Sequence, residues 1–189
     1  VMRKVLRSVL SKFKKIHEAE IPGIVPGSLL FFQKYCVIDI RRRIEEGLPG
    51  VFLANAPGTG KTRIIQAATA DMDTTVITPN SVVSAWDEES GKVLENVNIL
   101  TQRDMHSAVR KEQLQTRKRL RATLDVPHHT YVNREFLQRI EDSERFQLLS
   151  DEETIVVHDE GHSRANEQSL QSKGASMLDS KFQILVSAT

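Results

Sequence analysis

The chain has 189 residues, 39% of them hydrophobic, which suffices for one well-buried domain and is short for two. Its charges nearly cancel at a net +1, so contacts with nucleic acid would have to come from local basic patches rather than from overall charge. A single cysteine excludes an internal disulfide, and the sequence shows neither the ~20-residue apolar run of a membrane helix nor a secretory signal, so we expect an intracellular protein, cytoplasmic or nuclear (or nucleoid-associated), with no membrane partner.

The first segment, residues 1–17, is predicted to be a basic amphipathic helix. Apolar residues recur along it at helical spacing, and lysines and arginines occupy most of the remaining positions. Such a helix can cover part of the core, or it can contact nucleic acid or another acidic surface, and both interpretations stay open. Prolines and glycines in residues 21–28 end the helix, so we expect a helix and linker over 1–28 and the main domain over 29–189.

A second helix is expected from Leu30 to Glu46. Beyond it, short apolar runs rich in β-branched residues alternate with stretches long enough for helices. The runs are residues 51–54, 74–78, 97–100, 129–132, 154–157 and 182–186. Alternation of this kind predicts an α/β fold with a mostly parallel sheet and helices on both faces.

The first strand run leads directly into NAPGTGKT, residues 55–62, and then into a helical stretch. The two glycines allow the backbone to wrap around an anion with its N–H groups pointing inward, and the helix N-terminus adds partial positive charge. This context predicts a phosphate loop, in which Lys61 reaches the terminal phosphates of a nucleotide and Thr62 binds Mg²⁺ through its hydroxyl. The candidate nucleotide-binding residues of the loop are Asn55, Gly58, Thr59, Gly60, Lys61 and Thr62.

Residues 156–162, VVHDEGH, admit two interpretations. The two histidines could bind zinc, but the zinc motif requires a helix with a glutamate directly after the first histidine. Here an aspartate follows His158, and the preceding residues are a strand run, on which residues four apart are separated by roughly 13 Å. We therefore predict that Asp159 binds Mg²⁺ and that Glu160 polarises the water that attacks the terminal phosphate. Both would lie beside the phosphate loop at the C-terminal edge of the sheet.

With these residues the chain resembles the first RecA-like lobe of superfamily 2 helicases and translocases, closest to the DEAH-type branch that includes the chromatin-remodelling double-stranded-DNA motors. The resemblance covers residue 29 to the end. It rests on LLFFQKY, LANAPGTGKT, VITPNSVVSAWDEES, TYVNREFL, DEGHSRAN and SAT, which follow the family's order. It implies a RecA-like P-loop NTPase fold, ATP and Mg²⁺ as cofactors, a nucleic acid as the partner, with DNA favoured over RNA but the choice left open, and a second RecA-like lobe that this chain lacks.

The resemblance also implies roles for single residues around the nucleotide. Gln33 would read adenine, and Asn55 stands where the remodelling branch usually has aspartate. His162 would link the ATP site to Ser187 and Thr189, whose motif couples ATP turnover to strand movement.

Two regions are candidates for contact with nucleic acid. The resemblance places the loop at Pro79 and Asn80 against a nucleic-acid backbone. Residues 103–123 form the most basic stretch, which could follow phosphates by charge alone or could be an ordinary exposed helix. The candidate contacts are Pro79, Asn80, Arg110, Lys111, Arg117 and Arg119.

Three other residues are expected to be structural. His128 and His129 precede a strand run without a cysteine nearby, which does not favour a metal site. Trp86 falls on a predicted helix and favours core packing over a base-stacking platform.

The chain is thus predicted to be a P-loop ATPase, the ATP-binding lobe of a DNA helicase or translocase. Alone it should hydrolyse ATP very slowly, because arginine fingers of a second lobe contribute roughly 10³ to 10⁵ in rate. An AAA+ ATPase acting on proteins and a non-catalytic module that holds nucleotide or nucleic acid are the alternatives.

Overall fold

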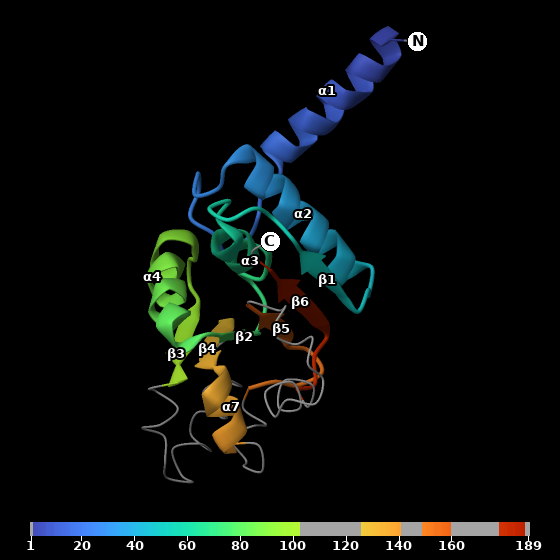
Figure 1. The fold of residues 1–189 in the computed structure, drawn as a ribbon. Helices are drawn as coiled ribbons and strands as arrows, with labels where there is room; N and C mark the ends of the chain where they lie inside the picture. The colour runs from blue at the N-terminus through green and yellow to red at the C-terminus, as the bar shows by residue number, and fades with distance from the viewer. Residues whose placement is uncertain (1, 103–125, 141–148, 160–177, 188–189) are drawn as a thin grey trace.

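A parallel β-sheet forms the centre of the computed structural model, which describes residues 2–102, 126–140, 149–159 and 178–187 (Figure 1). Within these residues the sheet has six strands in the order β1-β6-β5-β2-β4-β3, and each neighbouring pair is parallel. The strands are β1 Gly50–Leu53, β2 Thr74–Thr78, β3 Asn98–Thr101, β4 His128–Asn133, β5 Ile155–His158 and β6 Phe182–Val186. The predicted α/β fold is confirmed, with strand ends displaced by at most one residue.

Helices cover both faces of this sheet, as the alternation of strand and helix runs predicted. The α-helices of the described residues are α1 Met2–Glu18, α2 Phe31–Glu45, α3 Lys61–Ala68, α4 Val83–Val93 and α7 Arg134–Ile140, and a 3₁₀ turn η1 spans Asn80–Val82. Figure 1 shows α2, α3 and α4 on one face of the sheet and α7 on the other.

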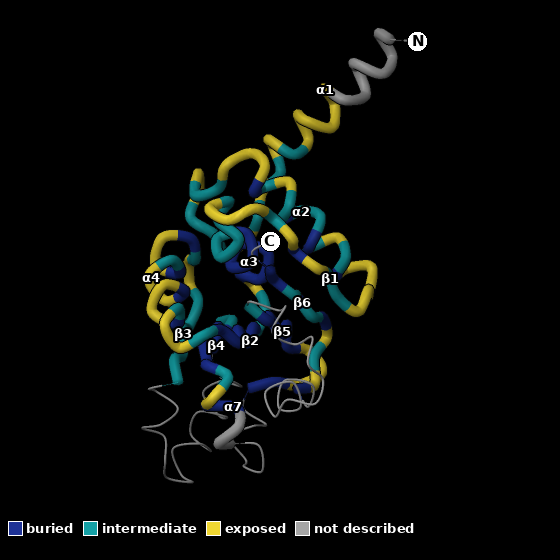
Figure 2. Tube along the Cα trace, in the orientation of Figure 1, coloured by how far each residue is buried: buried dark blue, intermediate teal, exposed yellow. Residues whose placement is uncertain are grey.

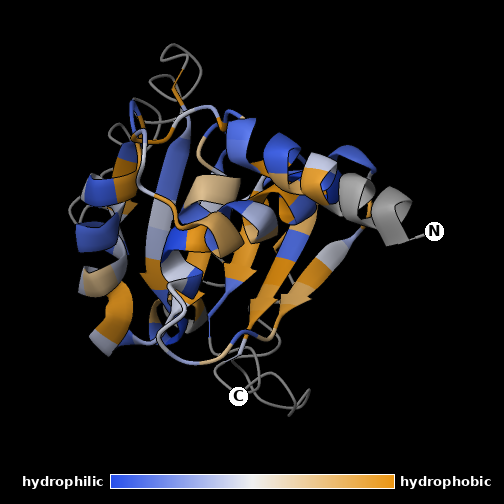
Figure 3. Ribbon diagram, turned by 90° about the horizontal axis from the view of Figure 1, so that it is seen from above, coloured by the Kyte–Doolittle hydropathy of each residue, from blue (hydrophilic) through white to orange (hydrophobic). Residues whose placement is uncertain are grey.

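The core is divided into two layers because successive strand residues point to opposite faces. Val76 and Val157 belong to the cluster beneath α2, α3 and α4, whereas their strand neighbours Ile77 and Val156 belong to the cluster beneath α7. Strands β2, β4 and β5 are accordingly buried along their length (Figure 2), and much of the sheet is hydrophobic in colour in Figure 3, with hydrophilic stretches between. Burial on both faces explains the nearly continuous apolar run of β5, whereas the equally buried β4 carries His128, His129 and Thr130.

Helix α1 projects from the body of the molecule (Figure 1). The predicted helix is confirmed, but the interpretation that its apolar stripe covers the core is wrong for Leu10 and Phe13, which are 64% and 50% exposed. The Phe13 ring stacks on Phe31 of α2 with centroids 5.2 Å apart. No helix in the described part of the chain is both long and apolar enough to cross a membrane.

The linker after α1 lies against the C-terminal end of α4. Val25 donates its N–H to the Val93 carbonyl at 2.8 Å, and Glu95 donates to the Gly23 carbonyl at 2.8 Å. The linker therefore packs on the main domain through backbone hydrogen bonds rather than extending into solvent.

Candidate nucleotide site

The phosphate loop and Asp159 lie at the same edge of the sheet. On β6, Leu185 is level with His158 and the next residue, Val186, is level with Leu53, so β1 and β5 end together on either side of β6. Two strand spacings separate β1 from β5 by about 10 Å. Ser187 follows β6 between them, buried, and donates its N–H to the Leu53 carbonyl at 3.3 Å.

The loop after β1 has the backbone conformation that its glycines predicted. Gly58 and Gly60 have φ values of 76° and 74°, in the left-handed region that other residues rarely adopt. Gly60 directly precedes α3, whose first residue is Lys61. A Cβ added at Gly58 would meet no heavy atom within 4 Å, so this backbone is open to the approach of a ligand.

Lys61 bends back over the loop. Its Nζ donates to the Asn55 carbonyl at 2.7 Å and to the Ala56 carbonyl at 3.2 Å. The ammonium therefore places a positive charge at the loop backbone, on the first turn of α3, where the helix dipole also favours an anion.

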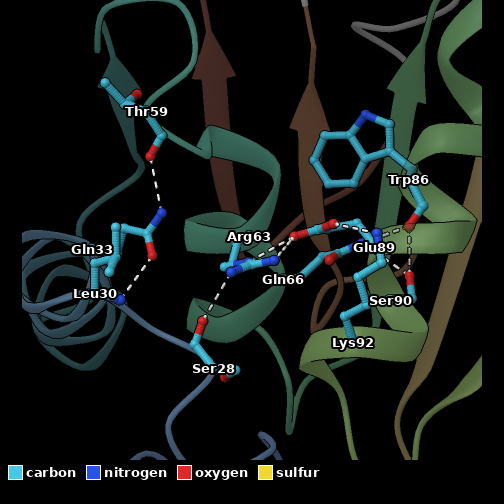
Figure 4. Close-up of polar contacts among 10 residues, drawn as sticks. All are labelled: Ser28, Leu30, Gln33, Thr59, Arg63, Gln66, Trp86, Glu89, Ser90 and Lys92. Atoms are coloured by element: carbon cyan, nitrogen blue, oxygen red, sulfur yellow. Dashed lines mark hydrogen bonds and ion pairs between the residues drawn. The ribbon is translucent and has the colours of Figure 1, made fainter.

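Gln33 fixes this loop to α2 (Figure 4). Its Oε1 accepts the Leu30 N–H at 2.9 Å and its Nε2 donates to the Thr59 carbonyl at 3.0 Å, while the residue is only 4% exposed. The first contact is half of a capping box at the start of the helix. The structure thus brings Gln33 to the phosphate loop, with its amide bonded to the chain's own backbone, and the adenine contact stays a prediction.

The carboxylate of Asp159 is held by two donors from the neighbouring strand and helix. Thr78 Oγ1 and Trp86 Nε1 both donate to Oδ2, at 2.8 and 3.0 Å. The backbone of Asp159 is also fixed, since its N–H donates to the Ile77 carbonyl at 2.9 Å and its carbonyl accepts from Arg134 at 2.6 Å.

The donor set at this edge fits Mg²⁺. The Thr62 hydroxyl and the Asp159 carboxylate are hard oxygen ligands of the kind that Mg²⁺ binds together with nucleotide phosphates. Among the residues that the structure describes, no three or more histidine, cysteine or acidic side chains gather into a group able to hold a metal. In addition, His158 lies on a strand and is buried.

Trp86 has a role that the sequence did not reveal. It is 1% exposed, which confirms the predicted core packing, yet its indole N–H reaches Asp159. The only available signal was general: a buried indole N–H usually finds a partner.

An ion pair joins α3 to α4 beside the loop (Figure 4). Arg63, directly after the loop, contacts Glu89 Oε1 with its Nε and its terminal nitrogen, each at 2.6 Å. Its other terminal nitrogen donates to the Ser28 carbonyl of the linker at 3.2 Å. Arg63 thereby connects the linker, α3 and α4, which the sequence did not indicate.

A cluster of three amide side chains lies at the C-terminal ends of β2, β3 and β4. Asn80 Oδ1 accepts from Gln102 Nε2 and from Asn133 Nδ2, both at 2.9 Å. Gln102 Oε1 accepts the Asn133 N–H at 3.1 Å. We call Asn80, Gln102 and Asn133 the amide cluster; only Asn80 was a predicted site residue.

Beneath α4 lies a buried polar network. Gln66 Nε2 donates to the Trp86 carbonyl at 2.8 Å and contacts Ser90 and Tyr131, while His129 Nε2 bonds the Thr69 carbonyl at 3.0 Å. Burial lowers the pKa of His129 to about 4 and raises the pKa of Tyr131 to about 12. The predicted structural role of His129 is confirmed, and His128 is buried beside it.

Seven predicted site residues lie outside the residues that the structure describes. They are Glu160, His162 and Thr189 of the ATPase motifs, and Arg110, Lys111, Arg117 and Arg119 of the basic stretch.

Comparison with known proteins shows the fold. No protein-family model and no curated protein matches the sequence. The Sulfolobus solfataricus SWI2/SNF2 ATPase core in complex with dsDNA is similar to 90% of this chain, with a TM-score of 0.69 and 21% identity. The Sulfolobus solfataricus SWI2/SNF2 ATPase core domain is similar to 89%, with a TM-score of 0.60 and 18% identity. This chain spans about a third of those chains, 34% and 32%. The predicted RecA-like α/β fold is thereby confirmed.

Proposed function

We propose that this chain is the ATP-binding lobe of a DNA helicase or translocase, closest to the DEAH-type double-stranded-DNA translocases. The observation that carries this proposal is the meeting of the phosphate loop and Asp159 at one sheet edge, with only β6 between their strands. A nucleotide's phosphates bind at such an edge of a parallel sheet, outside the carboxyl ends of the strands.

In this proposal the chain acts mainly by positioning the nucleotide, because phosphoryl transfer requires little covalent chemistry from the protein. The open backbone around Gly58 holds the phosphates, and Lys61 turns from its loop carbonyls to the terminal phosphates. Thr62 and Asp159 hold Mg²⁺, which neutralises charge on the phosphates when bound. Glu160 orients the attacking water.

Further residues complete the proposed nucleotide chemistry. Gln33 fixes the loop that borders the nucleotide and reads its adenine. His162, Ser187 and Thr189 couple hydrolysis to movement, and the buried position of Ser187 between the two motifs supports this assignment.

The proposed partner is duplex DNA, in an intracellular setting. Of the two SWI2/SNF2 ATPase cores described above, the one with the higher TM-score is in complex with dsDNA. On this chain we assign contact with the DNA backbone to the amide cluster and to Pro79, which precedes Asn80. The other assigned contacts are Arg110, Lys111, Arg117 and Arg119. A second RecA-like lobe would close the cleft and supply arginine fingers. Without them, we expect this lobe alone to hydrolyse ATP slowly.

Lys61→Ala is expected to weaken Mg²⁺-dependent binding of a labelled, non-hydrolysable ATP analogue by roughly 10- to 100-fold. The reason is that a hydrogen bond to a charged group contributes about 1.5–3 kcal/mol. The matched control is Lys181→Ala, which removes the same charge from an exposed lysine just before β6, at the opposite edge of the sheet. Equal affinities for the two variants would contradict the assignment of Lys61.

Duplex DNA separates the proposed motor from its alternatives. In the proposed motor the nucleotide and DNA sites are coupled, so at low salt we expect duplex DNA to raise the affinity for the nucleotide and the nucleotide to raise the affinity for DNA by the same factor. Nucleotide binding that depends on Lys61 but ignores DNA would favour an AAA+ ATPase or a non-catalytic module. A chain that binds no nucleotide would overturn the proposal.

A further inference from the structure

One nine-residue segment, from Thr78 to Trp86, contacts Asp159 at both of its ends. Thr78 is the last residue of β2 and Trp86 lies in the first turn of α4. Their two donors converge on one oxygen, Asp159 Oδ2, at 2.8 and 3.0 Å. Two independent donors on one oxygen restrict rotation of the carboxylate, so the segment sets the direction in which Asp159 presents its charge.

The middle of the same segment reaches the surface. Asn80 is exposed, and its side-chain oxygen accepts from Gln102 and Asn133, which follow β3 and end β4. Asn80 is thus two residues from Thr78 in the chain and six from Trp86. A ligand that displaces the amide cluster therefore pulls directly on the backbone that carries both donors to Asp159.

Trp86 is fixed firmly enough to transmit such a displacement. It is 1% exposed, its ring lies 5.9 Å from the Tyr131 ring, and its carbonyl accepts from Gln66 Nε2 and Ser90 Oγ at 2.8 and 2.7 Å. Because the core around it is close-packed, the indole moves with α4 as a unit rather than rotating alone. A shift of α4 then changes the hydrogen bond to Asp159.

We propose that Thr78 and Trp86 are positioning residues for Mg²⁺ at Asp159, and that the segment joining them couples this carboxylate to a polyanionic backbone bound at the amide cluster. This inference rests on the proposed function. It adds a physical connection between the nucleic-acid surface and the metal-binding carboxylate that runs through the described residues alone.

The chain reports on this contact through its own fluorescence, because Trp86 is its only tryptophan. We would excite the indole at the red edge of its absorption band, where nucleotides and DNA absorb little. Mg²⁺ with a non-hydrolysable ATP analogue is expected to change the emission, whereas the analogue with EDTA is expected to change it much less. Duplex DNA at saturating concentration should change it again in the wild type and not in Asn80→Ala.

Two variants test the positioning role without relying on fluorescence. Trp86→Phe keeps an aromatic ring but removes the N–H, and Thr78→Val keeps the shape but removes the hydroxyl. Each is expected to weaken Mg²⁺ affinity of the nucleotide-bound chain about 10- to 100-fold, as is typical when a partner that orients a metal ligand is lost. Nucleotide affinity in EDTA should stay near the wild-type value, and Thr78→Ser should restore Mg²⁺ affinity.

The outcomes separate this inference from the proposed function. Wild-type Mg²⁺ affinity in both Trp86→Phe and Thr78→Val, with nucleotide binding intact, would overturn the positioning role and leave the proposed function standing. An emission that saturating duplex DNA leaves unchanged in the wild type would overturn the coupling. A chain that binds no nucleotide would remove both, and thermal melting of each variant shows whether a loss of Mg²⁺ affinity reflects unfolding.

Discussion

Gly60→Ala is expected to lower the free energy of unfolding by about 2 to 5 kcal/mol. Part of this cost, about 1–2 kcal/mol, is the left-handed backbone at Gly60, whose φ is 74°. The remainder arises because a Cβ at Gly60 would collide with Gln33 Nε2. Gln33 is buried and bonded at both ends, so moving it leaves polar groups unsatisfied, at about 1–3 kcal/mol. Urea unfolding of the two proteins measures the difference.

Gly58→Ala is the matched control for this change. Gly58 has nearly the same backbone angle, with φ of 76°, but a Cβ there meets nothing within 4 Å. It should lose only the backbone contribution of about 1–2 kcal/mol. In a Gln33→Ala background the two alanine substitutions should cost the same, because the collision is gone. Equal costs in the wild-type background would show that Gln33 does not hold the loop.

Acidification from about pH 6.5 to pH 4 is expected to remove about 3 kcal/mol of stability through His129 alone. Burial lowers its pKa to about 4 in the folded chain, while the unfolded chain has an ordinary value near 6.5. Between these values the unfolded state binds a proton that the folded state does not, so stability falls as the pH falls. His129→Gln keeps a donor for the Thr69 carbonyl but cannot titrate, and its unfolding free energy should decline less over this range.

Tyr131→Phe is the control for the His129 experiment. It removes a hydroxyl from the same network without removing a group that titrates in this range. The unfolding free energy of this variant should therefore differ from that of the wild type by a constant amount at every pH, with the same slope.

Two carboxylates, those of Asp39 and Asp71, affect stability at lower pH. Hydrogen bonds from Arg42 and Arg43 lower the pKa of Asp39, and for Asp71 the ion pair with Arg41 outweighs burial and lowers its pKa too. Their stabilisation is present above about pH 3.8 and is lost below it. If the unfolding free energy of His129→Gln fell as steeply as that of the wild type between pH 6.5 and pH 4, the assignment of this acid destabilisation to His129 would be contradicted.

The sheet and the phosphate loop could be predicted because local sequence determines them. The central strands β2 and β5 are buried along their length and rich in β-branched residues, and the left-handed backbone at Gly58 and Gly60 requires glycine. The strand order could not be read from these runs. It depends on which runs pair, and β6, last in the chain, lies between β1 and β5.

The polar contacts of the site escaped prediction because their partners are distant in the sequence. Thr78 and Asp159 are 81 positions apart, and Asn80 and Asn133 are 53 apart. Trp86 shows the difficulty most clearly: helical position predicted its burial, but the direction of its N–H depends on the packing of α4 against α3 and β4. For α1, amphipathic spacing predicted the helix, yet spacing alone cannot say what an apolar stripe faces, and Phe13 is half exposed.

The place of β1 at the edge of the sheet has a consequence for the order of folding. Among the described strands its neighbour is β6 alone, and Gly50–Leu53 pair with residues 183–186. During synthesis the strand that carries the phosphate loop therefore waits for more than a hundred later residues before it gains its partner. Contacts so distant in sequence form slowly, because the loop between them must close first. We expect a ribosome-bound chain that ends before Phe182 to be cut readily by protease near residues 50–60, and a chain extended past β6 to resist.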